Sequence, residues 1–214
     1  MMFKDRNEVG YLLADKLEKY RKKDAIILAI PRGGVPIGFI ISQILNLPLE
    51  VILSKKIGHP FHKEYAIGAV TLKSRILSEA AKEVSNSYIE EETKRIRELL
   101  QKRYKEYYGE RNALKLKGKI LIIVDDGIAT GNTILSTIKM LHDENPDKII
   151  VAIPVAPPSA LKKLQDSPFI NEVICLSTPF NFQAVGQFYE DFNQVDDVEV
   201  NQLLKKATTK NTNS

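Results

Sequence analysis

The stretch that decides the fold runs from Lys119 to Ile134 and reads KILIIVDDGIATGNTI. A short apolar run, 121–124, leads into two carboxylates, Asp125 and Asp126, and then through a loop of small residues into a helical pattern. A continuous apolar run is typical of a strand that is buried on both faces of a parallel sheet. Ligand sites in open α/β sheets lie at the carboxyl ends of such strands, so this stretch predicts both a fold class and the place of a site.

The loop from Gly127 to Thr133 has the composition of a phosphate cradle. It contains two glycines and ends at a helix N-terminus, where backbone N–H groups and the hydroxyls of Thr130 and Thr133 can converge on an anion. Two adjacent carboxylates would repel a phosphate but accept hydrogen bonds from neighbouring hydroxyls. A ribose that carries a 5-phosphate offers hydroxyls to the carboxylates and a phosphate to the loop. The plainer alternative is that the segment is only a capped helix after an Asp-Gly turn.

The rest of the chain repeats strands and helices in the order of a doubly wound sheet. We therefore predict an α/β fold with a mainly parallel central sheet, flanking helices, a small hood and a long helical insertion. Expected strands cover 25–30, 49–53, 67–72, 75–77, 119–125, 148–155 and the run around Cys175, and expected helices cover 6–22, 35–45, 79–108, 132–142 and 198–206.

One domain over residues 1–206 accounts for this pattern, with hood elements at about 55–78 and 177–195. The long helix at about 79–108 forms the insertion. Residues 55–64 are polar, contain Gly and Pro, and are expected to form a loop. Small polar residues at 207–214 predict a disordered tail.

The bulk properties exclude several classes of protein. The net charge of +4 comes from basic residues interleaved with acidic ones, which favours small anionic substrates and disfavours nucleic acid. The single cysteine, Cys175, lies in an apolar run and is expected to be an inert core thiol. No apolar stretch of signal or membrane length is present, so we expect a cytoplasmic protein without membrane partners. Neither GxGxxG nor GxxxxGK[ST] occurs, and no His or Cys spacing predicts a protein metal site.

The stretch from the strand to the loop resembles the signature by which type I phosphoribosyltransferases bind 5-phosphoribosyl 1-diphosphate (PRPP). The resemblance implies that Asp125 and Asp126 bind the ribose 2- and 3-hydroxyls. It also implies a 5-phosphate loop made of Ala129, Thr130, Gly131, Asn132 and Thr133. The series PRGGVPIG, KKIGHP, EYAIGAV, VDDGIATGNT and FNFQAVGQFYEDF extends the likeness over nearly the whole chain, toward predicted phosphoribosyltransferases without an established acceptor.

The same resemblance assigns roles to two other loops. Arg32, Gly33 and Gly34 would form the pyrophosphate loop, often with an unusual cis peptide in the family, and Arg32 would balance leaving-group charge. The loop that carries Lys55 and Lys56 falls where the family places a mobile catalytic loop. We take Lys56 as the best catalytic candidate, with Lys55, His59 and His62 as lid residues. Mg²⁺ is the expected cofactor, held mainly through PRPP.

The acceptor pocket is the least defined part of the prediction. Phe180, Phe182 and Tyr189 could stack on a base, although aromatic residues in this region can equally bury the C-terminal segment against the core. Ala129 replaces an Asp that 6-oxopurine enzymes usually have, which disfavours hypoxanthine and guanine. The favoured function is transfer of 5-phosphoribosyl from PRPP to a small nitrogenous, base-like acceptor with release of pyrophosphate, as part of nucleotide metabolism. A PRPP- or nucleotide-sensing module without turnover is the alternative, and a homodimer through the long helix is left open.

Overall fold

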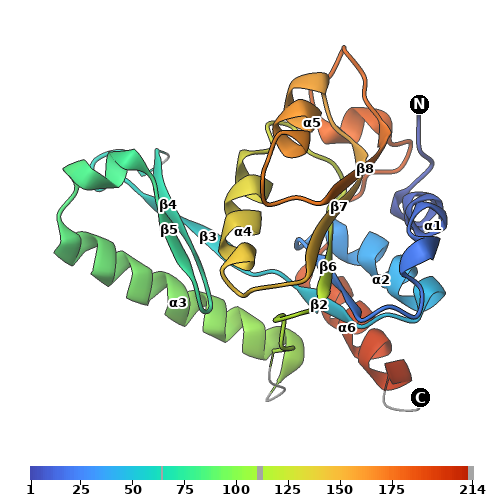
Figure 1. The fold of residues 1–214 in the computed structure, drawn as a ribbon, viewed down its shortest axis with the longest axis horizontal. Helices are drawn as coiled ribbons and strands as arrows, with labels where there is room; N and C mark the ends of the chain where they lie inside the picture. Colours follow the sequence, from blue (N-terminus) through green and yellow to red (C-terminus); the bar gives the residue numbers. More distant parts are fainter. Residues whose placement is uncertain (64, 110–112, 212–214) are drawn as a thin grey trace.

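A parallel sheet forms the centre of the computed structural model, which describes residues 1–63, 65–109 and 113–211. Its five strands are arranged in the order β2-β1-β6-β7-β8 (Figure 1). All four neighbouring pairs are parallel. The strands are β1 (Ala25–Ala29), β2 (Leu49–Val51), β6 (Ile120–Val124), β7 (Lys148–Val155) and β8 (Glu172–Ser177). Each lies where the sequence predicts a strand, and the doubly wound α/β fold is confirmed.

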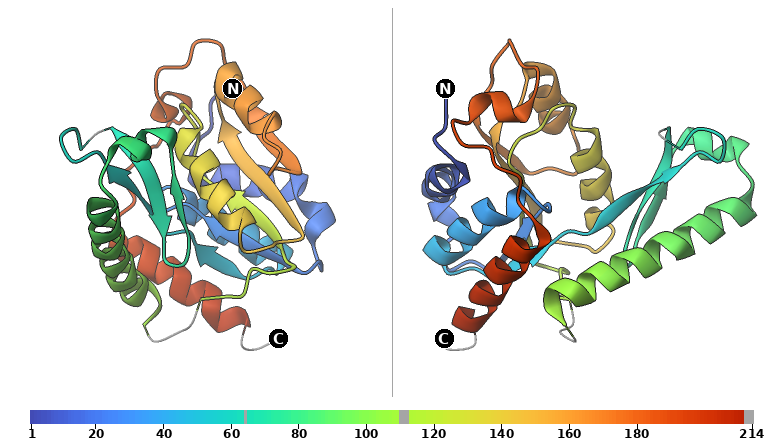
Figure 2. Two further views of the ribbon diagram at one scale, coloured as in Figure 1. Left: turned by 60° about the vertical axis from the view of Figure 1, so that its left-hand side comes forward. Right: turned by 180° about the vertical axis from the view of Figure 1, so that it is seen from behind.

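Helices cover both faces of this sheet (Figure 2). Residues of three helices pack into the core on one face: α1 (Arg6–Lys16), α2 (Gly34–Leu45) and α6 (Asp197–Asn211). The core on the other face is built with α4 (Asn132–His142) and α5 (Pro158–Gln165). Helix α1 is shorter than the helix expected over 6–22, and a 3-10 turn at Glu18–Tyr20 follows it.

Strand β1 shows why its sequence is continuously apolar. Ala25, Ile27 and Ala29 point into one core, and Ile26 and Leu28 point into the other. Each of the five is at most 3% exposed. Because successive side chains of a strand point to opposite faces, a strand covered on both faces needs apolar residues at every position.

The strand order reverses between β1 and β6. From β1 the chain continues through α2 to β2 on one side, whereas β6, β7 and β8 extend the sheet on the other side. The two strands pair in register up to Ala29 and Val124, so the loops that follow them leave the sheet side by side. Such a switch point is where open α/β sheets bind ligands.

An arm made of a small sheet and a long helix projects from this body (Figure 1). Its antiparallel sheet has the order β3-β4-β5 and is followed by helix α3. The elements are β3 (Ser54–Gly58), β4 (Ala66–Thr71), β5 (Arg75–Leu77) and α3 (Asn86–Tyr108). Buried residues of α3 include the five that the sequence places on its apolar face: Ile89, Ile96, Leu100, Tyr104 and Tyr107. A homodimer through this helix stays a prediction.

Two predictions about the arm are wrong in part. The polar stretch 55–64 is not all loop, because its first residues continue strand β3 and pair with β4. Only Ile57 of β3 is fully buried, so the strand lacks the apolar period that would reveal it. The helix expected over 79–108 is divided: a 3-10 helix covers Glu79–Glu83, and α3 begins after Ser85, whose hydroxyl accepts a hydrogen bond from the N–H of Tyr88.

The C-terminal region also differs from its prediction. Helix α6 continues to Asn211, through part of the expected disordered tail, and residues 212–214 lie outside the described part of the chain. Val200, Leu204 and Ala207 are buried at helical spacing, and their packing explains the longer helix. No helix in the described part of the chain is both long and apolar enough to cross a bilayer.

Candidate functional site

The loops that follow β1 and β6 lie against each other at the switch point. The N–H of Ile30 donates a hydrogen bond to the carbonyl of Val124 (2.9 Å). A β carbon at Gly33 would lie 1.9 Å from Oδ2 of Asp126, and one at Gly34 would lie 2.5 Å from the carbonyl oxygen of Val124. Both positions therefore need glycine because the neighbouring loop fills the space.

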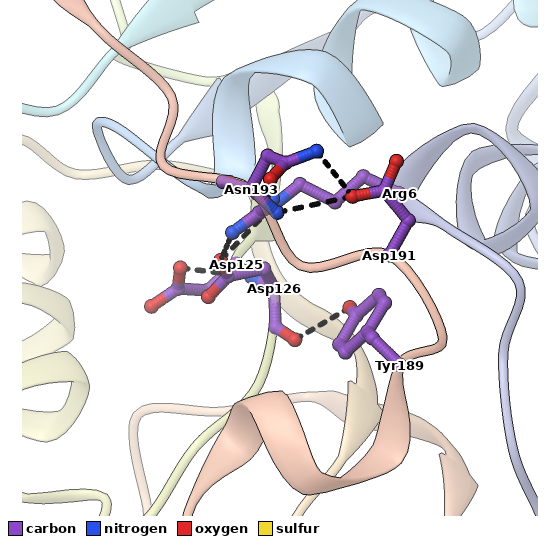
Figure 3. Close-up of polar contacts among 6 residues, drawn as sticks. All are labelled: Arg6, Asp125, Asp126, Tyr189, Asp191 and Asn193. Carbon is purple, nitrogen blue, oxygen red and sulfur yellow. Dashed lines mark hydrogen bonds and ion pairs between the residues drawn. The ribbon is translucent and has the colours of Figure 1, made fainter.

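The two carboxylates predicted to bind a ribose are placed together at this junction (Figure 3). The backbone N–H of Asp126 donates to Oδ1 of Asp125 (2.9 Å). Burial, and then the negative charge of Asp126, raise the pKa of Asp125 well above its ordinary value. The hydrogen bond from the Asp126 N–H and the positive charge of Arg6 oppose this rise. The pair therefore concentrates carboxyl oxygens at this junction, the neutral form of Asp125 is favoured, and a basic neighbour lies close by.

That neighbour, Arg6, was not predicted from the sequence. Its Nε and Nη2 donate to Oδ2 of Asp126 at 3.1 and 2.8 Å (Figure 3). Tyr189 supports the same residue from the C-terminal segment, because its hydroxyl donates to the backbone carbonyl of Asp126 (2.7 Å). No local motif could have revealed these contacts, since Arg6 lies 120 positions before its partner.

The predicted 5-phosphate loop is open to solvent and ends at a helix N-terminus. Ala129, Thr130, Asn132 and Thr133 are exposed. Gly131 is the N-cap of α4 with φ of 77°, in the left-handed region that favours glycine, and no side chain caps the helix. The first N–H groups of an α-helix have no partner within the helix, so this end presents donors and a partial positive charge to an anion.

A cleft of about 530 Å³ separates the arm from α4. Lys55 and Lys56 line it from β3, and Asn132 and Thr133 line it from the first turn of α4. The structure thus brings the candidate catalytic lysine and the candidate phosphate loop to one cavity. Both lysines are exposed. Further lining residues are Ser54, Lys63, Ala66, Gly68, Ala69, Ser136 and Thr137.

A second cavity, of about 350 Å³, lies beside Asp126. It is lined by Arg6, Arg32, Gly33, Asp126 and residues 192–195. The peptide bond between Pro31 and Arg32 is cis, in agreement with the resemblance to type I phosphoribosyltransferases. Nη1 of Arg32 lies 3.9 Å from a carboxylate oxygen of Asp197 in α6. The predicted pyrophosphate loop therefore contributes a cation next to the acidic pair.

Among the remaining predicted residues, Tyr189 reaches this site, whereas the two histidines line another cavity and Phe180 and Phe182 have other surroundings. His59 and His62 lie near the tip of the arm and line a different cavity, together with Tyr65, Glu79, Ala80, Lys82 and Glu83. Phe180 is 95% exposed, and Phe182 stacks on Phe188 with ring centroids 5.3 Å apart. Tyr189 is buried beneath Asp126. The three aromatic residues proposed for an acceptor pocket thus occupy three different surroundings. Cys175 is half-buried in edge strand β8 rather than fully buried in the core.

Fold and site together define a doubly wound α/β protein whose candidate ligand site lies at the switch point of its sheet. The family profile described as "Phosphoribosyl transferase domain" matches residues 4–187. The chain belongs to this family.

Three relatives show how far the likeness extends. Two Mycobacterium tuberculosis proteins, from strains CDC 1551 and ATCC 25618, are provisionally named phosphoribosyl transferases, and each is 35% identical over 213 residues. The match covers 96% of this chain but 47% of each relative, so the chain spans about half their length. The crystal structure of TT1426 from Thermus thermophilus has a TM-score of 0.84 and 36% identity, covering 96% of this chain and 99% of that one.

Proposed function

We propose that the protein transfers a 5-phosphoribosyl group from PRPP to a small nitrogenous, base-like acceptor and releases pyrophosphate. The observation that carries the proposal is the meeting of two loops at the switch point. Gly33 is packed against the carboxylate of Asp126, and the loop after β6 continues into the uncapped N-terminus of α4. Carboxylates that can accept hydrogen bonds from ribose hydroxyls therefore adjoin both a loop whose N–H groups can donate to a phosphate and a turn that carries the cation Arg32, which supports the proposal.

In this proposal each part of PRPP has its own partners. The ribose hydroxyls donate to Asp125 and Asp126, and the 5-phosphate accepts hydrogen bonds from residues 129–133. Arg32 lies in the loop assigned to the pyrophosphate. Lys56 shares a cleft with Thr133 and would bring positive charge over the bound donor if the arm moves toward the body.

The reaction exchanges one bond for another at the anomeric carbon of the ribose. The bond from C1 to the pyrophosphate oxygen breaks, and its electron pair leaves with pyrophosphate. The lone pair of the acceptor nitrogen forms the new C1–N bond, and that nitrogen then releases its proton to water. The transition state carries positive charge on the ribose, so nearby carboxylates and well-oriented phosphate donors would lower the barrier by positioning and electrostatics.

Mg²⁺ belongs to the same proposal. No set of three His, Cys, Asp or Glu side chains in the described parts of the chain is arranged to hold a metal. This fits a Mg²⁺ that enters on PRPP and is held mainly by the oxygens of PRPP itself. When bound, the ion would neutralise charge on the departing pyrophosphate.

Titration calorimetry with PRPP and Mg²⁺ tests the donor site. We expect saturable binding by the wild type and by the control variant Asp15→Asn, whose carboxylate is on the exposed surface of α1. Binding should be lost in the double variant Asp125→Asn/Asp126→Asn. Absence of PRPP binding by the wild type would overturn both transfer and sensing.

A second experiment separates an enzyme from a sensor. Pyrophosphate release is measured with PRPP, Mg²⁺ and a panel of nitrogenous acceptors that includes adenine, pyrimidines and the disfavoured 6-oxopurines. Transfer predicts release that depends on one acceptor class and disappears in the double variant. PRPP binding without release for any acceptor would favour the sensing module instead.

A further inference from the structure

Hydrogen bonds and an ion pair fix the side chain of Arg6 in the candidate site. It is the first residue of α1, and its guanidinium uses all three nitrogens: Nε and Nη2 bind Asp126 Oδ2, and Nη1 donates to the carbonyl of Asn193 (2.8 Å). The side chains of Arg6 and Asp126 are only 11% and 16% exposed. An ion pair this shielded from water interacts more strongly than one on the surface.

The N-terminal and C-terminal segments together hold this arginine in place. Phe3 pairs with the C-terminal segment: its N–H donates to the carbonyl of Phe188, and its carbonyl accepts from the N–H of Glu190. The ring of Phe192 lies beneath the guanidinium, with its centroid 4.0 Å from the central carbon, which is a cation–π contact. The orientation of Arg6 is therefore fixed from two sides before any ligand arrives.

One oxygen of the Asp126 carboxylate is fully engaged by these contacts. Oδ2 accepts both hydrogen bonds from Arg6, and Gly33 packs against it from the neighbouring loop. No N–H group of the described residues donates to Oδ1, and the carboxyl of Asp125 lies within hydrogen-bonding reach of the Asp126 carboxyl. A carboxylate can accept about four hydrogen bonds, so the Arg6 contact occupies one oxygen and leaves the other for a ligand.

We infer that Arg6 is a positioning residue for Asp126, which fixes Oδ2 so that Oδ1 accepts a hydrogen bond from the ribose of the donor. The inference rests on the proposed function. This role differs from that of a residue that PRPP must displace on binding. The nitrogens of Arg6 already donate to Asp126 and Asn193, and the aromatic ring beneath its guanidinium belongs to the protein itself. Arg6 stays in place in the bound state and acts through Asp126.

The charge of Arg6 has a second consequence at the same pair. The charged and titratable groups around Asp126 are Asp125 from its own loop, Arg6 from α1, Arg32 from the loop after β1, and Tyr189 from the C-terminal segment. Burial and the neighbouring carboxylate raise the pKa of Asp125, and Arg6 opposes that rise. Without Arg6 the pair would take up a proton at higher pH. A protonated pair offers fewer acceptors to the ribose, so donor binding would weaken as the pH falls.

The test uses Arg6→Gln, Arg6→Lys and a matched control, Arg21→Gln. Arg21 also binds a carboxylate, that of Glu18, and a backbone carbonyl, that of Ile44, but lies outside the candidate site. PRPP affinity is measured by calorimetry between pH 5.5 and 8.5. Carbon-13 NMR follows the carboxyl groups of the acidic pair in the ligand-free protein, and thermal unfolding records stability.

We expect Arg6→Gln to weaken PRPP binding on the order of tenfold at pH 7.5, because a hydrogen-bonded charge is lost, and further at lower pH. In the ligand-free variant the carboxyl titration of the pair should move to higher pH. Arg6→Lys should restore the pH profile but only part of the affinity, since a lysine cannot reproduce the planar two-point contact. Arg21→Gln should change neither affinity nor titration.

Three results would overturn the inference. Wild-type affinity in Arg6→Gln at every pH would show that Asp126 needs no support. Equal losses in Arg6→Gln and Arg6→Lys without any change in the carboxyl titration would show that Arg6 only stabilises the fold. Failure of the wild type to bind PRPP would remove the proposed function and this inference with it. The NMR titration needs no ligand, so it would still report whether Arg6 acts on the pair.

Discussion

Replacing Gly33 with alanine would test whether the two loops at the switch point hold Asp126 in a binding geometry. Gly33 has φ of −61° and ψ of −31°, which alanine adopts without strain, so the added methyl group is the whole perturbation. Its carbon would lie 1.9 Å from Oδ2 and 2.4 Å from Cγ of Asp126. Ordinary contact begins near 3.4 Å, and the carboxylate or the loop must therefore move by roughly 1.5 Å.

Such a shift would break the hydrogen bonds of 2.8 and 3.1 Å from Arg6 and displace the oxygen assigned to the ribose. A hydrogen bond to a charged group contributes about 1.5–3 kcal/mol, so losing one ribose contact should weaken PRPP binding by roughly 10- to 100-fold. Calorimetry measures the affinity, and thermal unfolding shows that the domain remains folded.

Gly38→Ala on the same helix is the matched control. A β carbon there would lie 3.1 Å from atoms of Ala29 and Leu49, which alters packing between α2 and the sheet but leaves the loops untouched. This control should change stability and keep wild-type affinity. If Gly33→Ala bound PRPP as tightly as the wild type, contact between the loops would not set the geometry of the site.

Three further predictions concern other parts of the molecule. Lys55→Ala/Lys56→Ala should reduce pyrophosphate release at least tenfold with little change in melting temperature, since both side chains are exposed; unchanged release would remove the arm from catalysis. Leu204→Ala should lower the free energy of unfolding by about 2–5 kcal/mol in urea titrations, whereas an unaffected midpoint would contradict the packing of α6. Burial raises the pKa of Glu172, but hydrogen bonds from Lys19 and Tyr20 outweigh this effect and lower the pKa below its ordinary value. The contribution of Glu172 to the free energy of unfolding should be complete above its pKa in the unfolded state and disappear as the pH falls through its pKa in the folded state. Glu172→Gln should therefore make the free energy of unfolding less dependent on acid pH.

The central sheet could be predicted from the sequence because both faces of its strands are covered. In β1 and β6 every position must be apolar, and such runs are visible without knowledge of their partners. Strand β3 could not be predicted in this way. It packs one side chain, Ile57, into a core, and pairing with β4 determines its structure.

The candidate site was predictable to the extent that it is local in the sequence. The acidic pair, the predicted phosphate loop and the turn at Arg32 each occupy a few consecutive residues, and the order of the strands brings them to one edge of the sheet. Arg6 and the hydroxyl of Tyr189 reach Asp126 from the two ends of the fold, and no spacing rule connects positions so far apart. The tail prediction was wrong over residues 207–211 for a related reason: α6 packs against α2, α3 and β2, which are distant in the sequence, and Ala207 is buried.

The pairing of Phe3 with the segment around Phe188 also determines when the site can form during synthesis. A chain emerging from the ribosome can build β1, β6 and their loops before residues 188–193 exist. Until those residues dock, the carbonyl that accepts from Arg6 and the hydroxyl that supports Asp126 are absent. Under the proposed function, PRPP binding would therefore require residues 188–193 to be docked, and PRPP bound to that state would also protect the paired segments around Phe3 and Phe188 against local opening and proteolysis.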